Sequence, residues 1–304
     1  MTLLTRLLVL LCTLSSFSQD LDLSALSIDP ALKENADSVI REERTMLDIT
    51  NPHVLDMHIY KVVSVYNKAG NADVQAYAYY DDDRKVKDIK ATIYDVLGKE
   101  VKVFRQRDFR DVSAVSGGTL YADDRVLYLD YTPTSYPYTV VFEYKIRSKT
   151  TAFLPRWIPV ANYGSSTQHA TYEVLYDPVT SLNIKQERLD AYNITHIKKP
   201  GHQIWEASNI KAVKKEYRSP SFDKLMPLVK CAVSDFTLKG IKGNAGSWQK
   251  FGDWMSTNLM ADTDELSEET AQFIQKLVKD LPSAEARARA IYKYVQDKVR
   301  YISV

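Results

Sequence analysis

The chain has 304 residues, with 40 lysines and arginines against 39 aspartates and glutamates, which gives a formal net charge of +1. It contains no block of basic or acidic residues, so the sequence indicates neither nucleic acid nor an anionic membrane surface as a partner. Its 20 tyrosines against 10 glycines favour a β-rich chain with well-filled sheets. Beyond the N-terminus, no apolar run approaches the length that spans a membrane.

The first residues have the form of a secretory signal peptide. Arg6 supplies a positive charge, and residues 7–14 form an apolar run too short to cross a bilayer. Residues 16–18 give a small-x-small cleavage pattern, so we expect a signal peptide at residues 1–18. This predicts export in a Gram-negative bacterium, to the periplasm or cell envelope or as a secreted protein.

The sequence contains two cysteines, Cys12 and Cys231. Cys12 does not indicate a lipoprotein, because the bulky Leu11 precedes it where lipid-modification sites carry a small residue. After removal of the signal peptide one cysteine remains, so no internal disulfide can form. Cys231 lies in a predicted strand on the same face as Val229 and Val233, which is typical of a core residue rather than a reactive thiol.

After a polar leader at residues 19–38, alternation with a period of two dominates the chain. Strands are predicted at residues 57–66, 74–80, 86–94, 101–104, 125–131, 138–146, 170–176, 181–186, 190–195, 202–208 and 228–236, whereas residues 38–49 are ambiguous between helix and strand. Turn residues at 95–99, including Gly98, predict a hairpin. These short strands predict a large antiparallel β-sandwich over residues 39–243.

The predicted boundary of the sandwich is marked by four residues that favour turns, Gly240, Gly243, Asn244 and Gly246. Beyond them the hydrophobic period changes to about 3.6, and Ser247, Ser267 and Ser283 each precede an amphipathic segment as an N-cap. The predicted fold class is therefore mainly β, a large antiparallel β-sandwich followed by a short α-helical segment at residues 244–304.

The last predicted helix resembles the opening helix of the transglutaminase-like domain of bacterial secreted proteins. The resemblance is carried by Ala288, Ile291, Tyr292, Tyr294, Val295, Asp297, Val299, Arg300 and Tyr301. In that family a Cys-His-Asp triad of the papain type follows downstream, and it would lie beyond Val304. We therefore expect an incomplete transglutaminase-like domain, with an exposed apolar face that contains Ile291 and Val295.

The order of the predicted elements resembles a bacterial arrangement in which a domain of unknown function, a β-sandwich, precedes the transglutaminase-like core. Its local anchors are residues 94–101, 123–131 and 142–148. The resemblance implies an exported cysteine-dependent enzyme that cleaves or forms amide bonds in peptides or cell-wall material. This chain would contribute the accessory sandwich and would be inactive alone.

An alternative function is an exported binding module for a glycan, a peptide or a cell-envelope partner, without enzymatic activity. Aromatic side chains that alternate on the strands could hold such ligands, although packing within the sheets is the favoured explanation for them. They are Tyr77, Tyr79, Tyr128, Tyr136, Tyr138, Trp157 and Trp205. The sequence identifies no individual partner, substrate or ligand.

The sequence predicts no metal ligand, cofactor-binding residue or catalytic residue. The histidines, His53, His58, His169, His196 and His202, lack the spacing that places two imidazoles on one helix face for zinc. His196 and His202 flank a predicted loop. The acidic run at residues 81–83 suits calcium in its oxygen ligands but lacks the rest of an EF-hand loop, so a solvated turn is favoured.

Overall fold

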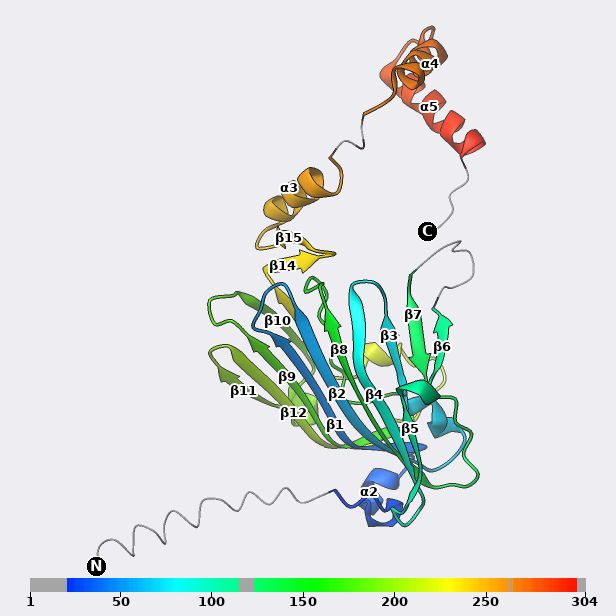
Figure 1. Cartoon of the computed structure of the whole chain (residues 1–304), viewed down its shortest axis with the longest axis vertical. Helices are drawn as coiled ribbons and strands as arrows, with labels where there is room; N and C mark the ends of the chain where they lie inside the picture. The colour runs from blue at the N-terminus through cyan, green and yellow to red at the C-terminus, as the bar shows by residue number, and fades with distance from the viewer. Residues whose placement is uncertain (1–20, 115–122, 262, 264, 300–304) are drawn as a thin grey trace, which may run out of the picture.

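The computed structural model describes residues 21–114, 123–261, 263 and 265–299, so the predicted signal peptide lies outside the described residues. Its main element is an eight-stranded sheet with the strand order β11-β12-β9-β1-β2-β8-β4-β5 (Figure 1). The strands are β1 (Ser38–Ile49), β2 (Leu55–Val65), β4 (Arg84–Tyr94), β5 (Glu100–Arg105), β8 (Tyr138–Ser148), β9 (Ser165–Tyr176), β11 (Thr195–Lys199) and β12 (His202–Ile210). Neighbouring strands are antiparallel, except that β1 and β9 run parallel.

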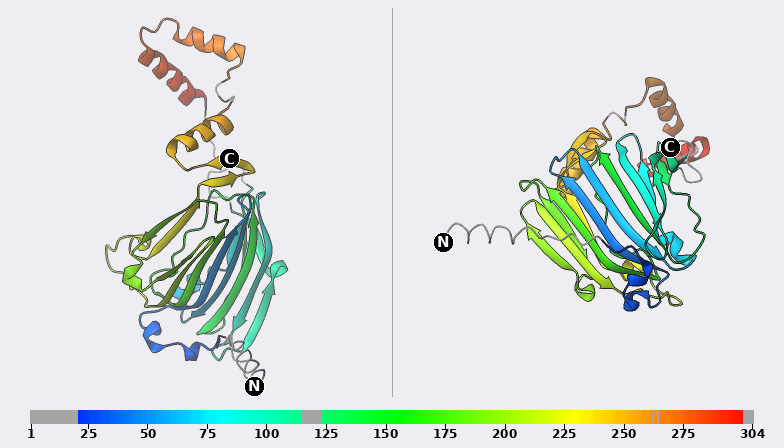
Figure 2. Two further views of the ribbon diagram at one scale, coloured as in Figure 1. Left: turned by 90° about the vertical axis from the view of Figure 1, so that its left-hand side faces the viewer. Right: turned by 60° about the horizontal axis from the view of Figure 1, so that its bottom comes forward.

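Three smaller sheets accompany the large one. They are a three-stranded sheet in the order β3-β7-β6, the pair β10-β13 and the pair β14-β15. Their bounds are β3 (Tyr77–Tyr80), β6 (Arg110–Ser113), β7 (Arg125–Tyr128), β10 (Leu182–Glu187), β13 (Leu228–Val233), β14 (Asp235–Leu238) and β15 (Ile241–Asn244). The large sheet is curved, as the side view in Figure 2 shows. The mainly β fold that the sequence predicts is confirmed, with one parallel strand pair as a departure from the antiparallel expectation.

Two hydrophobic cores lie on one face of the large sheet, which we call the inner face. The first core joins β1, β9 and β12 to β13 and includes Tyr172, Trp205 and Cys231. The second core joins β2, β4 and β8 to β3 and β7 and includes Phe142 and Leu127. Alternation produces this arrangement, because every second side chain of a strand reaches the same face. Polar side chains of the same strands reach the opposite, outer face.

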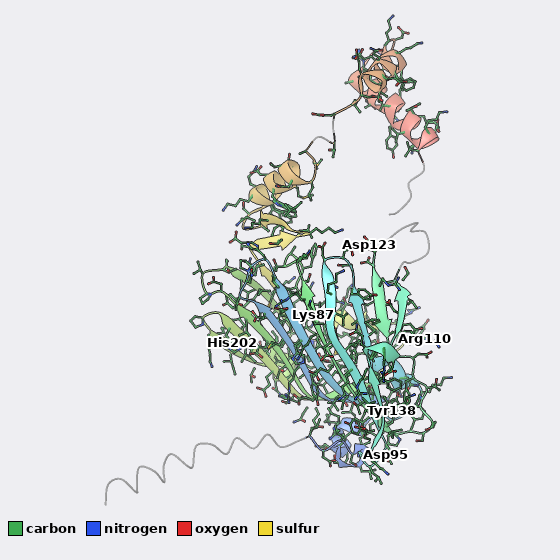
Figure 3. The ribbon with its side chains drawn as sticks, viewed as in Figure 1. Lys87, Asp95, Arg110, Asp123, Tyr138 and His202 are labelled. Carbon is green, nitrogen blue, oxygen red and sulfur yellow. The ribbon has the colours of Figure 1, made fainter. Side chains whose placement is uncertain are left out.

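Strand β8 illustrates the alternation most clearly. Its predicted inner residues are all buried or half-buried, and they are Tyr138, Val140, Phe142, Tyr144 and Ile146. The predicted hairpin after β4 is also confirmed: Asp95 N–H donates to the Lys99 carbonyl at 2.9 Å. Gly98 adopts a φ of 81°, and a Cβ there would lie 2.7 Å from Ser24 N, so the turn packs tightly on the N-terminal segment (Asp95 in Figure 3).

The α-helices of the described residues are α2 (Pro30–Lys33), α3 (Trp248–Asn258), α4 (Glu268–Val278) and α5 (Ala284–Lys298). The three predicted N-caps are confirmed. The hydroxyl oxygens of Ser247, Ser267 and Ser283 each accept a hydrogen bond from a backbone N–H three residues later. Short 3₁₀ segments are Ala25–Ser27, Ala69–Asp73, Gln106–Asp108, Asp190–Tyr192 and Phe222–Lys224.

Helix α3 packs against the β14-β15 hairpin, whereas α4 and α5 pack against each other further along the chain (Figure 1). The Trp254 indole N–H donates to the Lys242 carbonyl at 2.8 Å. A Cβ at Gly243 would lie 2.4 Å from the Phe236 ring, so glycine allows this close approach. Of the expected exposed apolar face, Val295 on α5 is 44% exposed, whereas Ile291 is half-buried, so the expectation is confirmed only in part.

Several predicted strands need correction. In residues 74–80 only β3 is a strand, because Val74 is helical and Gln75 has a φ of 50°, so the chain turns before crossing the inner face. In residues 190–195 a 3₁₀ turn forms, because Asn193 takes the left-handed conformation that its side chain tolerates. The predicted break at residues 240–246 contains β15, and the ambiguous residues 38–49 form β1.

Within the described part of the chain, we find no helix whose length and apolar character would allow it to span a membrane.

Candidate functional site

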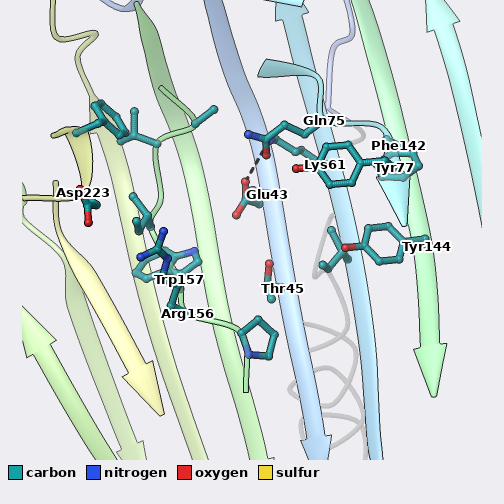
Figure 4. Close-up of a pocket in the computed structure, with 16 residues that line it drawn as sticks. Glu43, Thr45, Lys61, Gln75, Tyr77, Phe142, Tyr144, Arg156, Trp157 and Asp223 are labelled. Carbon is teal, nitrogen blue, oxygen red and sulfur yellow. Dashed lines mark hydrogen bonds and ion pairs between the residues drawn. The ribbon is translucent and has the colours of Figure 1, made fainter. Parts of the chain in front are cut away.

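A pocket of about 790 Å³ opens on the inner face between the two cores (Figure 4). Its floor is formed by side chains of β1, β2 and β8, where neither β13 nor β3 covers the large sheet. The lining residues are Glu43, Thr45, Ile59, Lys61, Gln75, Tyr77, Phe142, Tyr144, Pro155, Arg156, Trp157, Ile158, Val160, Ala161, Phe222 and Asp223. This volume falls in the range typical of small-molecule and cofactor sites.

A buried pair of opposite charges, Glu43 and Lys61, lies on the pocket floor. They occupy facing strands, since Glu43 on β1 is the register partner of Lys61 on β2. Their side chains are only 13% and 8% exposed, and Lys61 Nζ lies 3.8 Å from Glu43 Oε2. Lys61 Nζ also donates to the Asp73 carbonyl at 3.2 Å and to Gln75 Oε1 at 3.3 Å. Lys61 is therefore held by three oxygen-bearing neighbours.

Glu43 is less well satisfied than Lys61. The 3.8 Å separation exceeds an ordinary hydrogen bond, and no other described residue donates to the Glu43 carboxylate within 3.5 Å. Burial raises the pKa of Glu43 above its usual value, and the nearby Lys61 charge opposes this shift only in part. A poorly satisfied carboxyl group with a raised pKa, facing a pocket, is a physical indication of a functional site.

Aromatic side chains form much of the pocket wall. The Phe142 and Tyr144 rings lie 5.2 Å apart on β8, and burial raises the pKa of Tyr144 well above its usual value. Tyr77 on β3 is 41% exposed and meets Tyr79 edge to face, with 5.4 Å between ring centroids. Trp157, in contrast, is 2% exposed and stacks on Tyr172 in the first core. Its indole N–H has no partner among the described residues.

A second set of charges lies at the pocket rim. Arg156 and Asp223 are both exposed there. The Ser221 hydroxyl is the main cause that lowers the pKa of Asp223, and the Arg156 charge acts in the same direction. Each charge in the pocket thus has an opposite charge near it. The site can accept hydrogen bonds at Glu43 and offer apolar contact at its walls.

The predicted structural role of Cys231 is confirmed. It lies on β13 between Val229 and Val233 and is buried in the first core. Burial raises the pKa of its thiol to about 12, so the nucleophilic thiolate is scarce at neutral pH. The part of the chain that the structure describes therefore offers no activated cysteine.

The histidines are distributed over strands and turns rather than gathered. Three of them contact carboxylates on the outer face of the large sheet: His58 with Glu143 at 2.6 Å, His202 with Glu173 at 2.6 Å, and His169 with both Glu42 at 3.0 Å and Glu206 at 2.9 Å. His53 pairs with Thr237. His196 on β11 and His202 on β12 flank the turn at residues 200–201, as predicted, and the His196 ring stacks on Trp205. Among the described residues, no group of three or more metal-ligating side chains occurs.

His169 shows how the outer face differs from the pocket. The hydrogen bond to Glu42 is the largest influence on its pKa, and with Glu206 it raises the pKa to about 9 despite partial burial. The pKa of Glu42 is lowered, because the contacts with His169 and Arg44 outweigh the opposing effect of burial. Adjacent glutamates on β1 thus shift in opposite directions.

The predicted turn at residues 81–83 is confirmed. Asp81 Oδ1 accepts hydrogen bonds from the backbone N–H groups of Asp83 at 2.8 Å and Arg84 at 2.7 Å. Of the predicted aromatic residues, Tyr138, Trp157 and Trp205 are buried, whereas Tyr77, Tyr79 and Tyr136 are exposed. The exposed rings therefore do not form one continuous platform with the tryptophans.

Sequence reasoning did not identify Glu43 and Lys61 as site residues. One signal was available: Lys61 interrupts the apolar inner face of β2, between Ile59 and Val63. A charged residue in the middle of an apolar alternation indicates a buried charge that needs a partner. That partner could not be read from the sequence, because the β1 register depends on a bulge between Ile40 and Glu42.

The fold and pocket define a β-sandwich domain with a pocket between two cores. The chain belongs to the DUF3857 family, a domain of unknown function with a solved structure, whose match covers residues 53–214. This match is more than half of the chain and lies within the predicted sandwich. No curated protein sequence matches the chain.

A solved structure from another bacterium shares the fold. A candidate protease from Parabacteroides distasonis is similar with a TM-score of 0.59 at 12% identity, covering 88% of this chain and 52% of its own. The present chain thus spans about half the length of that protein. Legionella pneumophila aminopeptidase A gives a TM-score of 0.28 at 12% identity, covering 65% of this chain and 21% of its own. An M1 zinc metallopeptidase from Deinococcus radiodurans gives a TM-score of 0.29 at 12% identity, covering 83% of this chain and 55% of its own. The last two scores carry no argument about fold or function.

Proposed function

We propose that this chain supplies the accessory, non-catalytic sandwich of an exported transglutaminase-like protein that acts on peptide or amide bonds. In this proposal helices α3 to α5 belong to the start of the transglutaminase-like part. A cysteine thiolate of that part would attack the amide carbonyl, with a histidine as general base and an aspartate orienting it. The sandwich would position a substrate or partner.

The observation that carries this proposal is the state of Cys231. Its thiol is buried in the first core, its pKa is raised to about 12, and no histidine contacts it among the described residues. A cysteine nucleophile needs a lowered pKa or an adjacent base, and Cys231 has neither. The described part of the chain is therefore suited to support catalysis elsewhere rather than to perform it.

A second candidate function is an exported binding module without any enzymatic partner. The inner-face pocket favours it, because the pocket joins a poorly satisfied carboxyl group, Glu43, to apolar walls. Sites of this kind bind ligands through a few placed polar groups and a larger apolar surface. Both candidates assign a binding role to the same pocket, and they differ in whether catalysis accompanies it.

Both candidate functions assign this chain a non-catalytic role, and an activity assay tests that shared expectation. We would incubate the purified chain with fluorescein-labelled casein, with and without iodoacetamide, and with a Cys231→Ala variant. The proposal expects no hydrolysis above the buffer rate in any sample. Turnover that disappears in Cys231→Ala and on alkylation would contradict it.

Export is part of the proposal and has its own test. We expect the chain, expressed in a Gram-negative host with its first 18 residues, to appear in the periplasmic fraction. Sequencing of its N-terminus should begin near Gln19. A cytoplasmic product that retains Met1 would argue against export.

A further inference from the structure

Strand β3 is an open edge beside the pocket. It terminates the three-stranded sheet β3-β7-β6, and within the described residues no strand pairs with its other side. Leu129 N–H donates to the Ala76 carbonyl at 2.9 Å, and Ala78 is the register partner of Leu127. Because antiparallel pairs bond at alternate residues, Tyr77 and Tyr79 direct their backbone groups away from β7.

Most of these outward backbone groups lack a partner. Tyr77 N–H donates to the Gln75 carbonyl at 2.9 Å, which leaves the Tyr77 carbonyl and both groups of Tyr79. An edge with unpaired N–H and C=O groups is a template for another strand. Gln75 and Tyr77 also line the pocket, so this template begins at the pocket wall.

The opposite wall of the pocket is already a short strand-like contact. Trp157 N–H donates to the Val229 carbonyl at 2.9 Å, and Val229 N–H donates back at 3.0 Å. The layer over the inner face therefore reaches the pocket from both sides: from β13 through Trp157, and from β7 through β3. The pocket is the interruption between these two parts.

The charges of the pocket indicate what kind of segment would fit. Glu43 faces Lys61, and Asp223 lies near Arg156. Because the pocket charges are paired in this way, a net charge on the ligand would not strengthen its binding. Lys61 already donates to two oxygens, whereas Glu43 accepts no hydrogen bond within 3.5 Å from described residues. The unmet demand is for a hydrogen-bond donor above Glu43.

The aromatic walls argue against a sugar as the first choice. A sugar stacks on an exposed ring face, but Trp157 is 2% exposed and already stacks on Tyr172. Tyr144 is largely buried beside Phe142. Tyr77 alone, among the aromatic lining residues, exposes more than a third of its surface.

We propose that the pocket binds an extended, uncharged peptide segment that adds a strand to the open edge of β3 and places a hydrogen-bond donor side chain on Glu43. Backbone pairing to Tyr79 gives affinity, and the Glu43 contact gives selectivity for serine, threonine, asparagine or glutamine. This inference rests on the proposed binding role of the pocket and specifies its ligand.

The probe is a library of fluorescein-labelled, amidated heptapeptides without Asp, Glu, Lys or Arg, with binding measured by fluorescence anisotropy. We expect the bound peptides to carry a donor side chain at a fixed position. Binding should slow backbone hydrogen exchange in the segment that contains Tyr79. N-methylation of the backbone of a bound peptide at alternate residues should lower its affinity for the chain at least tenfold.

Two variants of the full chain locate the contact. Glu43→Ala should lower the affinity for the peptide about tenfold. Glu42→Ala, on the outer face of the same strand, should change this affinity by less than about twofold. Tyr79→Pro removes the outward N–H without touching a β7 bond, and it should abolish binding. Tyr79→Val retains the N–H and serves as its control. Thermal unfolding of each variant verifies that it is folded.

The outcomes separate the ligand from the site. Binding of cellohexaose or chitohexaose, sensitive to Glu43→Ala, with no peptide bound, would overturn the peptide inference while the binding role stands. Peptide affinity unchanged in both Glu43→Ala and Tyr79→Pro would overturn the β3 contact. If neither peptides nor sugars bind, both the inference and the proposed binding role fail.

Discussion

Two adjacent glutamates on strand β1, one on the outer face and one on the inner face of the sheet, differ in their contacts and in the direction of their pKa shifts. Glu42 on the outer face contacts His169 and Arg44, and its pKa is lowered. Glu43 on the inner face faces the pocket, and burial raises its pKa. The outer face satisfies its charges with cross-strand partners, whereas the inner face leaves one carboxyl group poorly satisfied. Such an incomplete arrangement persists where a ligand can complete it.

The largest expected effect comes from the core that frames the pocket. Trp205 is fully buried in the first core, beside Tyr172. Trp205→Ala should lower the free energy of unfolding by about 3–5 kcal/mol, because it leaves a large cavity. Urea unfolding followed by tyrosine fluorescence measures it. A loss below about 1 kcal/mol would mean that this half of the inner face is not the rigid frame described.

Removal of the buried cation tests the pocket floor itself. Lys61→Met should lower the free energy of unfolding by about 2 kcal/mol, since the Asp73 carbonyl and Gln75 lose their donor and Glu43 loses its counter-charge. The double variant Lys61→Met with Glu43→Gln should recover part of that loss, as a double-mutant cycle would show. Strict additivity of the two changes would contradict the coupling of Glu43 and Lys61.

The two glutamates should respond oppositely to pH. A raised folded pKa, as for Glu43, gives stability that is present below the usual value of 4.5 and lost as pH rises through the folded pKa. A lowered pKa, as for Glu42, gives stability present above 4.5 and lost as pH falls through the folded pKa. At pH 7, Glu42→Gln should therefore destabilise the fold by about 1 kcal/mol, whereas Glu43→Gln should not destabilise it.

Urea unfolding of both variants between about pH 3 and pH 7 gives the comparison. As pH rises, the free energy of unfolding of Glu42→Gln should decrease relative to that of the parent chain. The free energy of unfolding of Glu43→Gln should increase relative to the parent chain. Parallel pH dependence of the two variants would mean that the faces do not differ in the way described.

The smallest effect is expected outside the sandwich. Val295 on α5 is exposed, and Figure 1 shows α5 away from the sheets. Val295→Glu should change the unfolding midpoint of the sandwich by an amount equivalent to less than about 0.5 kcal/mol. The sandwich transition can be followed by near-ultraviolet circular dichroism. A larger shift would show that α5 stabilises the sandwich.

Much of the fold could be predicted from the sequence, because local rules determined it. The alternation of β8 and the serine caps of α3, α4 and α5 depend on neighbouring residues alone. The buried state of Cys231 followed from its position between two valines in the same way. These features need no knowledge of distant contacts.

The candidate site could not be predicted, because it depends on contacts between distant segments. Glu43 and Lys61 meet only through the β1–β2 register. Gln75 reaches Lys61 only because the chain turns at Gln75, where φ is positive. The parallel pairing of β1 with β9 joins segments more than a hundred residues apart. Short-range periodicity contains no information on such pairings.

The most direct test of the difference between the faces is a carbon-13 NMR titration of the glutamate carboxyl groups, with Glu42→Gln and Glu43→Gln used to assign the two signals. The structure predicts that Glu43 titrates above the usual value of 4.5 and Glu42 below it. A Glu43 carboxyl that titrates at or below Glu42 would show that it is already satisfied, and the case for a ligand site on the inner face would fail.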